Sequence, residues 1–135
     1  MKKFAFLMLL VIIAASFSAS CSKKDEKPIR ILSINDIQSD PLAFTGEITI
    51  NGVVAAFSPY DQTVFGIKDT AELFACRNLE CGAFMLPVKY TGNGSMPELA
   101  DEVNVTGSWK QVDDGFIFEV TKIDVKRNVM KILMS

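Results

Sequence analysis

Two cysteines, Cys76 and Cys81, stand with four residues between them and carry the most reactive side chains of the chain. A thiol pair of this kind could close a disulfide, give two thiolate ligands to copper(I), or cycle between redox states. The spacer is longer than that of thioredoxin-type motifs, and two ligands fall short of a closed zinc site. We expect a structural disulfide. The alternatives are a copper carrier, with Met85 or Met96 adding a thioether, and a redox sensor.

The chain contains no histidine. This absence excludes serine-histidine and cysteine-histidine catalysis, as well as histidine-ligated zinc and haem. Neighbouring carboxylates do not replace it. Asp101 and Glu102 point to opposite faces of a strand, and Asp113-Asp114-Gly115 is ordinary turn chemistry. We therefore expect a binding protein rather than an enzyme, with no catalytic residues, no metal site and no cofactor.

The first 20 residues have the pattern of an export signal. Lys2 and Lys3 precede an apolar run over 4–15, and small residues at 18–20 lead to Cys21. The run is too short for a membrane-spanning helix, which needs about 20 residues. The small residues before Cys21 resemble the lipobox of bacterial lipoproteins, although Ser18 stands where that family usually has leucine. The resemblance implies cleavage before Cys21, whose thiol would carry a diacylglycerol with acyl chains such as palmitate.

Residues 21–28 are charged and contain no apolar side chain apart from Cys21 and Pro28. Such a segment cannot pack, so it predicts a solvated tether between the anchor and a folded domain over 29–135. Ser22 replaces the aspartate that retains lipoproteins of enterobacteria in the inner membrane. The resemblance thus implies a membrane-anchored protein of the cell envelope. In a Gram-negative host it would sit on the periplasmic or surface face of the outer membrane.

Acidic residues dominate the middle of the chain. From Asp36 to Glu102 there are ten acidic side chains against three basic ones, Lys68, Arg77 and Lys89. Binding of nucleic acid depends on clustered lysine and arginine that displace counterions from phosphates. The sequence therefore excludes nucleic acid as a partner and leaves the membrane, through the anchor, and a protein of the envelope.

Five β-branched or alternating segments, separated by turn residues, predict an all-β domain. They cover residues 47–57, 63–69, 84–90, 102–109 and 116–125. Gly52 inside the first segment indicates a bulge or sharp bend. An insertion over 70–83, which carries both cysteines, separates the second and third strands. Residues 126–135 could extend the fifth strand or form a short helix.

The succession Gly46-Glu47-Ile48, Phe65–Asp69, Asp101–Gly107 and Gly115–Phe118 resembles the signature of a five-stranded OB-fold barrel. Val88–Gly92 and Met96–Leu99 also resemble the periplasmic haem chaperone of cytochrome c maturation, itself an OB-fold. Because that family attaches haem through a histidine, the resemblance does not extend to haem carriage. A barrel of the tRNA-anti-like or haem-chaperone-like kind is the expected fold, which leaves the function open.

Aromatic and apolar side chains outside the predicted core suggest where a partner would bind. Alternation directs Phe65, Phe84, Phe116 and Phe118 inward, whereas Tyr60 and Tyr90 fall at strand or loop ends. Phe74 and Leu79 lie in the insertion, which we expect to project as a charged knob. The leading hypothesis is an accessory or docking module of an envelope complex that binds through Phe74, Leu79, Tyr60 and Tyr90. An oligosaccharide binder that uses Tyr60, Tyr90 or Trp109 is a further alternative.

Overall fold

The computed structural model describes residues 29–134 and contains one six-stranded sheet with four short helices. The strands are β1 (Ile31–Ser33), β2 (Ile48–Phe57), β3 (Val64–Lys68), β4 (Leu86–Tyr90), β5 (Asp101–Val112) and β6 (Gly115–Asn128). The helices are α2 (Ile34–Gln38), the 3-10 helix η2 (Pro41–Ala43), α3 (Thr70–Cys76) and α4 (Val129–Leu133). The predicted signal peptide, Cys21 and the tether lie outside the described residues.

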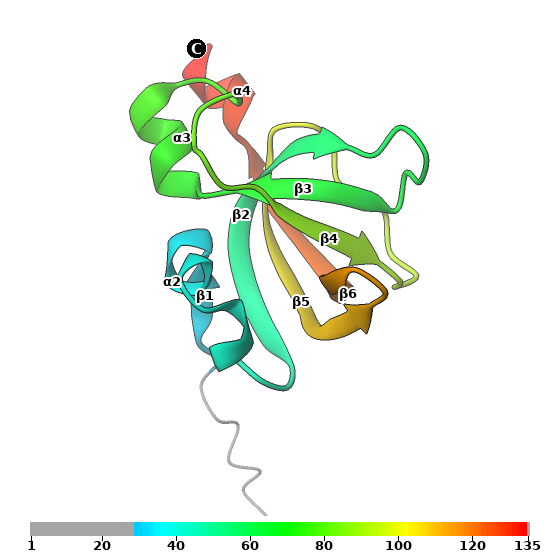
Figure 1. The fold of residues 1–135 in the computed structure, drawn as a ribbon. Coiled ribbons are helices and arrows are strands. Elements are labelled where there is room, and N and C mark those ends of the chain that lie inside the picture. Colours follow the sequence, from blue (N-terminus) through cyan, green and yellow to red (C-terminus); the bar gives the residue numbers. More distant parts are fainter. Residues whose placement is uncertain (1–28, 135) are drawn as a thin grey trace, which may run out of the picture.

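Five of the strands close into a barrel (Figure 1). The order runs β2-β3-β4-β6-β5, and β5 returns to pair with β2 from Ile48↔Gly107 to Val53↔Glu102. All neighbours are antiparallel except β4 and β6, which pair in parallel over Val88–Tyr90. This is the strand order of an OB-fold, so the expected all-β barrel is confirmed. The insertion lies between β3 and β4, the second and third strands of the barrel, as expected.

Strand β2 holds the barrel together because it is long enough to pair with three neighbouring strands. Its first half pairs with β5 on one side and with β1 on the other, and its second half pairs with β3. A register shift lies between Val54 and Ala56, three residues beyond the bulge or bend expected around Gly52. At Gly52 a Cβ would stand 3.0 Å from the Lys68 carbonyl oxygen. Gly52 therefore allows close approach of β3 where β2 changes neighbours.

The residues outside the five predicted strands form regular elements as well. Residues 31–33 make β1, which pairs in parallel with β2, and α2 follows directly. Ser33 and Asp36 form a reciprocal capping box that starts α2. At the other end, β6 runs to Asn128 before the chain turns into α4, so both outcomes considered for the C-terminal tail occur in succession.

Alternating strand residues fill the barrel with one main core. Phe65 and Phe118 are fully buried there, and Trp109 packs edge-on against Phe118 with ring centroids 5.1 Å apart. A second, smaller cluster lies outside the barrel wall beneath α3 and α4, where Val53 meets Leu73, Ala100 and Val129. The two helices thus close one end of the molecule, while β1 and η2 lie away from it (Figure 1).

Candidate binding surfaces

The insertion begins with a well-capped helix. Asp69, which is buried, accepts hydrogen bonds from the backbone N–H groups of Ala71 (2.9 Å) and Glu72 (3.2 Å) and so caps α3. The helix ends at Arg77, whose φ of 60° lies in the left-handed region and whose N–H donates to the Leu73 carbonyl. That turn reverses the chain directly after Cys76.

The two cysteines of the insertion are paired. The Cys76 and Cys81 sulfur atoms lie within bonding distance, and their Cα atoms are 6.2 Å apart. Lys68 Nζ donates to the carbonyl oxygens of Glu80 (3.2 Å) and Cys81 (3.0 Å), which ties the returning loop to β3. The arrangement supports the expected disulfide. Among residues 29–134, no three His, Cys, Asp or Glu side chains gather as a metal site would require.

The insertion packs against the barrel instead of projecting from it. Phe74, Leu79 and Cys81 are partly buried against the second cluster. The Arg127 guanidinium lies 4.9 Å from the centroid of the Phe74 ring, and its Nε donates to Glu102 across the sheet at 2.5 Å. Phe74 and Leu79 are therefore largely engaged within the molecule. The expectation of a projecting knob is corrected, because β2 turns Val53 outward and leaves an apolar surface that the insertion covers.

Tyr90 was expected on a contact surface, and its position in the structure corrects that expectation. It is the last residue of β4 and continues the inward alternation of Leu86 and Val88, so it is only 7% exposed. Its hydroxyl accepts a 2.7 Å hydrogen bond from the N–H of Gly94. Tyr90 is thus a core residue whose polar tip holds the following loop.

Tyr60 has the opposite environment, since it is 97% exposed at the turn between β2 and β3. Beside it lies a cleft of about 480 Å³, which we call the tyrosine-side cleft. Two segments distant in sequence form it, the end of β2 with the following turn and the loop before β5. Its lining residues are Phe57, Ser58, Pro59, Gln62, Met96 and Pro97.

Hydrogen bonds stiffen the turn that presents Tyr60. Asp61 Oδ1 accepts from the Thr63 hydroxyl (2.6 Å) and from the Thr63 N–H (2.9 Å), and Lys89 Nζ lies 3.8 Å from Asp61 Oδ2. These hydrogen bonds, with the Thr63 hydroxyl contributing most, and the Lys89 charge hold the pKa of Asp61 below its ordinary value. The turn is therefore ordered by an ionised carboxylate at neutral pH.

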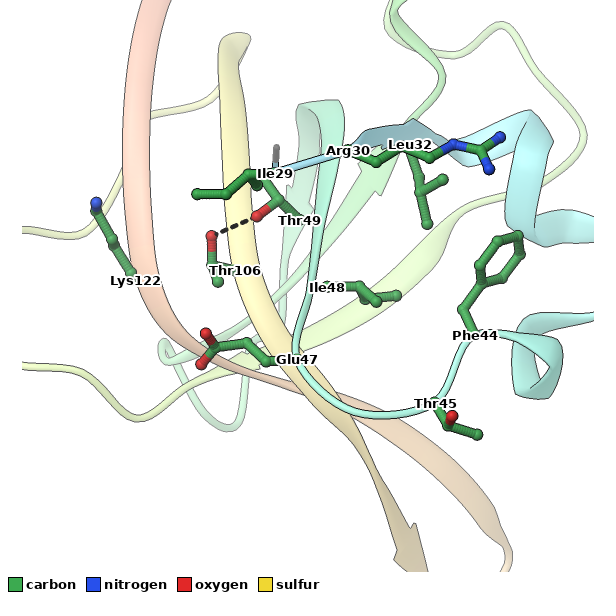
Figure 2. A pocket seen from close by; sticks show the side chains of 10 residues that line it. All are labelled: Ile29, Arg30, Leu32, Phe44, Thr45, Glu47, Ile48, Thr49, Thr106 and Lys122. Atoms are coloured by element: carbon green, nitrogen blue, oxygen red, sulfur yellow. Dashed lines mark hydrogen bonds between the residues drawn. The ribbon is translucent and has the colours of Figure 1, made fainter. Parts of the chain in front are cut away.

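A second cleft, of about 540 Å³, lies where β1 meets β2, and sequence reasoning did not foresee it. Figure 2 shows its side chains. Thr49 and Thr106 are joined there by a 2.9 Å hydrogen bond, with Glu47 and Lys122 near them and Phe44, Ile48 and Leu32 towards the other side. The period-two alternation of β2 and β5 places both threonines on the outer face, which is the signal that could have found them. We call this the threonine-pair cleft.

Comparison with known proteins adds a similarity in structure. No protein-family model matches this chain, and no curated protein matches it either. Among solved structures, the hypothetical protein YgiW from E. coli superposes with a TM-score of 0.49 and 14% sequence identity. The similarity covers 72% of this chain and 90% of that one. Among the described residues there is no helix that is both long and apolar enough to cross a membrane.

Proposed function

We propose that this protein is a lipid-anchored binding module of the cell envelope that docks an apolar segment of a partner protein in the tyrosine-side cleft. The observation that carries the docking site is the position of Tyr60. An almost fully exposed tyrosine stands beside a concave surface lined by Phe57, Met96 and two prolines. Aromatic anchors next to apolar pockets are typical centres of protein interfaces. The module works without catalysis in this proposal.

The charges near the cleft indicate the chemistry of the partner segment. Asp61 and Glu98 flank the cleft in sequence, and the Lys89 ammonium lies 3.8 Å from the Asp61 carboxylate. The described domain carries nine basic and fourteen acidic side chains, a net charge of −5. A segment with apolar side chains for the cleft and a basic residue beside them would complement both features. We propose that such an apolar, basic-flanked segment is the occupant.

The anchor part of the proposal rests on the resemblance of residues 18–21 to a lipobox. An intact mass of the protein extracted from its native membrane tests it directly. A diacylglycerol adduct on Cys21 and loss of residues 1–20 are the expected results. A further deficit of about 2 Da, restored by reduction, would report the disulfide. An unmodified Cys21 in the mature protein would contradict the anchor and leave the docking site to be tested separately.

The docking part is tested with the full chain in its native envelope. A photoreactive residue at position 60 should give one dominant protein adduct, whereas the same residue in place of Met134, which is 81% exposed, should not. Met96→Arg places a long cationic side chain in the cleft and should abolish the adduct while the fold remains intact. A peptide from the captured partner that spans the cross-linked segment should bind the wild-type chain and lose affinity at least about fivefold with Tyr60→Ala.

Two outcomes would contradict docking at this cleft. The first is an adduct that survives Met96→Arg unchanged, since the partner would then not occupy the cleft. The second is an adduct of equal yield from positions 60 and 134, which would indicate unspecific encounter. Thermal unfolding of each variant separates loss of binding from loss of fold.

A further inference from the structure

The threonine-pair cleft has one side on which polar groups converge. Thr49 on β2, Thr106 on β5 and Lys122 on β6 are successive partners across three strands, so their side chains form one row on the outer face. Thr49 is only 7% exposed, although it is polar. The hydrogen bond between the two threonine hydroxyls consumes one of their two protons, and neither hydroxyl bonds to another described residue. One hydroxyl proton is therefore left to donate to a ligand.

Two oppositely charged side chains, Lys122 and Glu47, lie on this side of the cleft. Neither forms an ion pair or a side-chain hydrogen bond with any residue of the described range. Lys122 acts electrostatically on Asp124, whose carboxylate already bonds to Lys126. Figure 2 shows the ammonium beside Thr106 and the carboxylate below it, apart from each other. An ammonium and a carboxylate held apart in one cleft suit a ligand that carries both signs of charge.

The opposite side of the cleft is mainly apolar, although Arg30 also lines it, with its guanidinium extending away from the threonine pair (Figure 2). Leu32 belongs to the main core, and Phe44 and Ile48 are partly buried against it. Ile29, which is 79% exposed, extends over the threonine pair (Figure 2). These side chains would shield the apolar part of a bound molecule from water. With a volume of about 540 Å³, the cleft lies within the range of small-ligand sites.

We propose that the threonine-pair cleft binds the phosphoethanolamine headgroup of a membrane phospholipid. The phosphate would accept from Lys122 and the remaining threonine hydroxyl proton, and the ammonium would donate to Glu47. The glycerol and the first acyl carbons would lie along Ile48 and Phe44. A purely anionic headgroup would leave Glu47 unmatched and repelled, and a neutral sugar would leave both charges without a counterion. The zwitterion is the class that uses every charged group on this side.

The position of the cleft in the chain supports a lipid source, and this step rests on the proposed anchor. Ile29, which lines the cleft, follows Cys21 by eight residues, which span at most about 29 Å when fully extended. A lipidated Cys21 would therefore keep the cleft close to a bilayer surface. The proposed protein site beside Tyr60 uses the far end of β2 and shares no lining residue with this cleft, so it would stay available to a partner.

The test uses the full chain, isotopically labelled and held in nanodiscs of phosphatidylglycerol. Glycerophosphoethanolamine, which has no acyl chain, is titrated while the amide resonances of Glu47, Thr106 and Lys122 are followed. We expect saturable shifts at these residues, and much smaller ones with glycerophosphoglycerol, which lacks the ammonium. Glu47→Gln and Thr106→Val should each weaken binding at least about fivefold, which corresponds to about 1 kcal/mol. Glu80→Gln, an exposed acid in the insertion, is the matched control and should change nothing.

A second titration identifies the source of the headgroup. When phosphatidylethanolamine replaces half of the nanodisc lipid, it should compete, and the apparent affinity for the soluble headgroup should fall. An unchanged affinity would assign the site to a free solute and overturn the membrane proposal. The proposal of a zwitterionic ligand would be overturned by equal responses to both headgroups or by no response. Full binding by Glu47→Gln would overturn it as well. The first titration uses a soluble probe, so its result is independent of whether Cys21 is lipidated and of docking at Tyr60. The second titration uses protein whose Cys21 lipidation has been verified by intact mass.

Discussion

At the scale of single residues, the Asp61 carboxylate determines how Tyr60 is presented. Its hydrogen bonds to Thr63 favour the ionised form, which is why the pKa of Asp61 lies below the ordinary value of about 3.8. A lowered pKa means that the stabilising effect on the turn is present above the unfolded pKa. It is lost as the pH falls through the lower, folded value.

We expect Thr63→Val to raise the pKa of Asp61 towards its ordinary value, because the hydroxyl that contributes most to the shift is removed. The backbone hydrogen bond and Lys89 remain, so the return should be incomplete. Titration of the Asp61 carboxyl carbon by NMR measures the shift. Thr45→Val, at a distant exposed threonine, serves as the control. An Asp61 pKa that does not move in Thr63→Val would show that the turn is held by other contacts.

The burial of a side chain could be predicted where the strand pattern continues on both sides of the residue. Phe65 and Phe118 are fully buried, as alternation indicates. Phe116 has the same pattern but is 49% exposed, because it lies at the tip of the β5–β6 hairpin beyond the barrel wall. The prediction that Tyr90 lies on the surface was wrong, because the turn residues after it indicated a loop while its own backbone still belongs to β4.

At the scale of elements, helix α3 depends on Asp69. This buried carboxylate caps two N–H groups of α3, and its second oxygen accepts a 3.4 Å hydrogen bond from the N–H of Asn35 in α2. Asp69→Ala should lower the free energy of unfolding by about 1–3 kcal/mol, since the helix cap is lost and the N–H groups of Ala71 and Glu72 lose their acceptor. Chemical denaturation measures the loss. Asp40→Ala, at a cap position without a side-chain hydrogen bond, should cost much less.

The disulfide of the insertion should contribute modestly to stability. Closing a loop this short removes little chain entropy, so replacing both Cys76 and Cys81 by alanine should cost about 2 kcal/mol. The fold should survive, because Phe74 still packs against Arg127 and Leu73 still fills the second cluster. Wild-type protein unfolded under a dithiol reductant should give the same midpoint as the variant. Unfolding of the reduced protein at neutral pH without denaturant would contradict this account.

The elements themselves were predictable to different degrees. The five barrel strands could be predicted, because each carries alternating or β-branched residues between turn signals. Strand β1 could not be predicted, since three residues of mixed polarity show no hydrophobic periodicity. Only their pairing with β2 makes them a strand. The insertion was located correctly, but its packing depends on Val53 facing outward beneath α3, a contact between segments that local pattern does not reveal.

At the scale of the whole molecule, the net charge distinguishes this barrel from OB-fold proteins that bind single-stranded nucleic acid. Those proteins combine a basic groove with exposed stacking aromatics. Here the described domain has a net charge of −5, and Phe65 and Phe118 point inward. We expect no saturable binding of a fluorescent single-stranded oligonucleotide in polarisation measurements, even at low ionic strength where such binding is strongest. Saturable binding that weakens with salt would show that a local basic surface overrides the net charge.

The closure of the barrel by β2 and β5 determines when the domain can fold. Ile48, at the start of β2, finds its partner only when Gly107 has joined the chain, after β3, α3 and β4 have been made. A chain that is synthesised or threaded through a narrow channel from its N-terminus therefore cannot close the ring early. Until the β5–β6 hairpin arrives, β2, β3 and β4 form an open sheet with two bare edges, that of β2 which later pairs with β5 and that of β4 which later pairs with β6. Such long-range pairing is slow, on the order of milliseconds to seconds, so this topology delays folding until the chain is nearly complete.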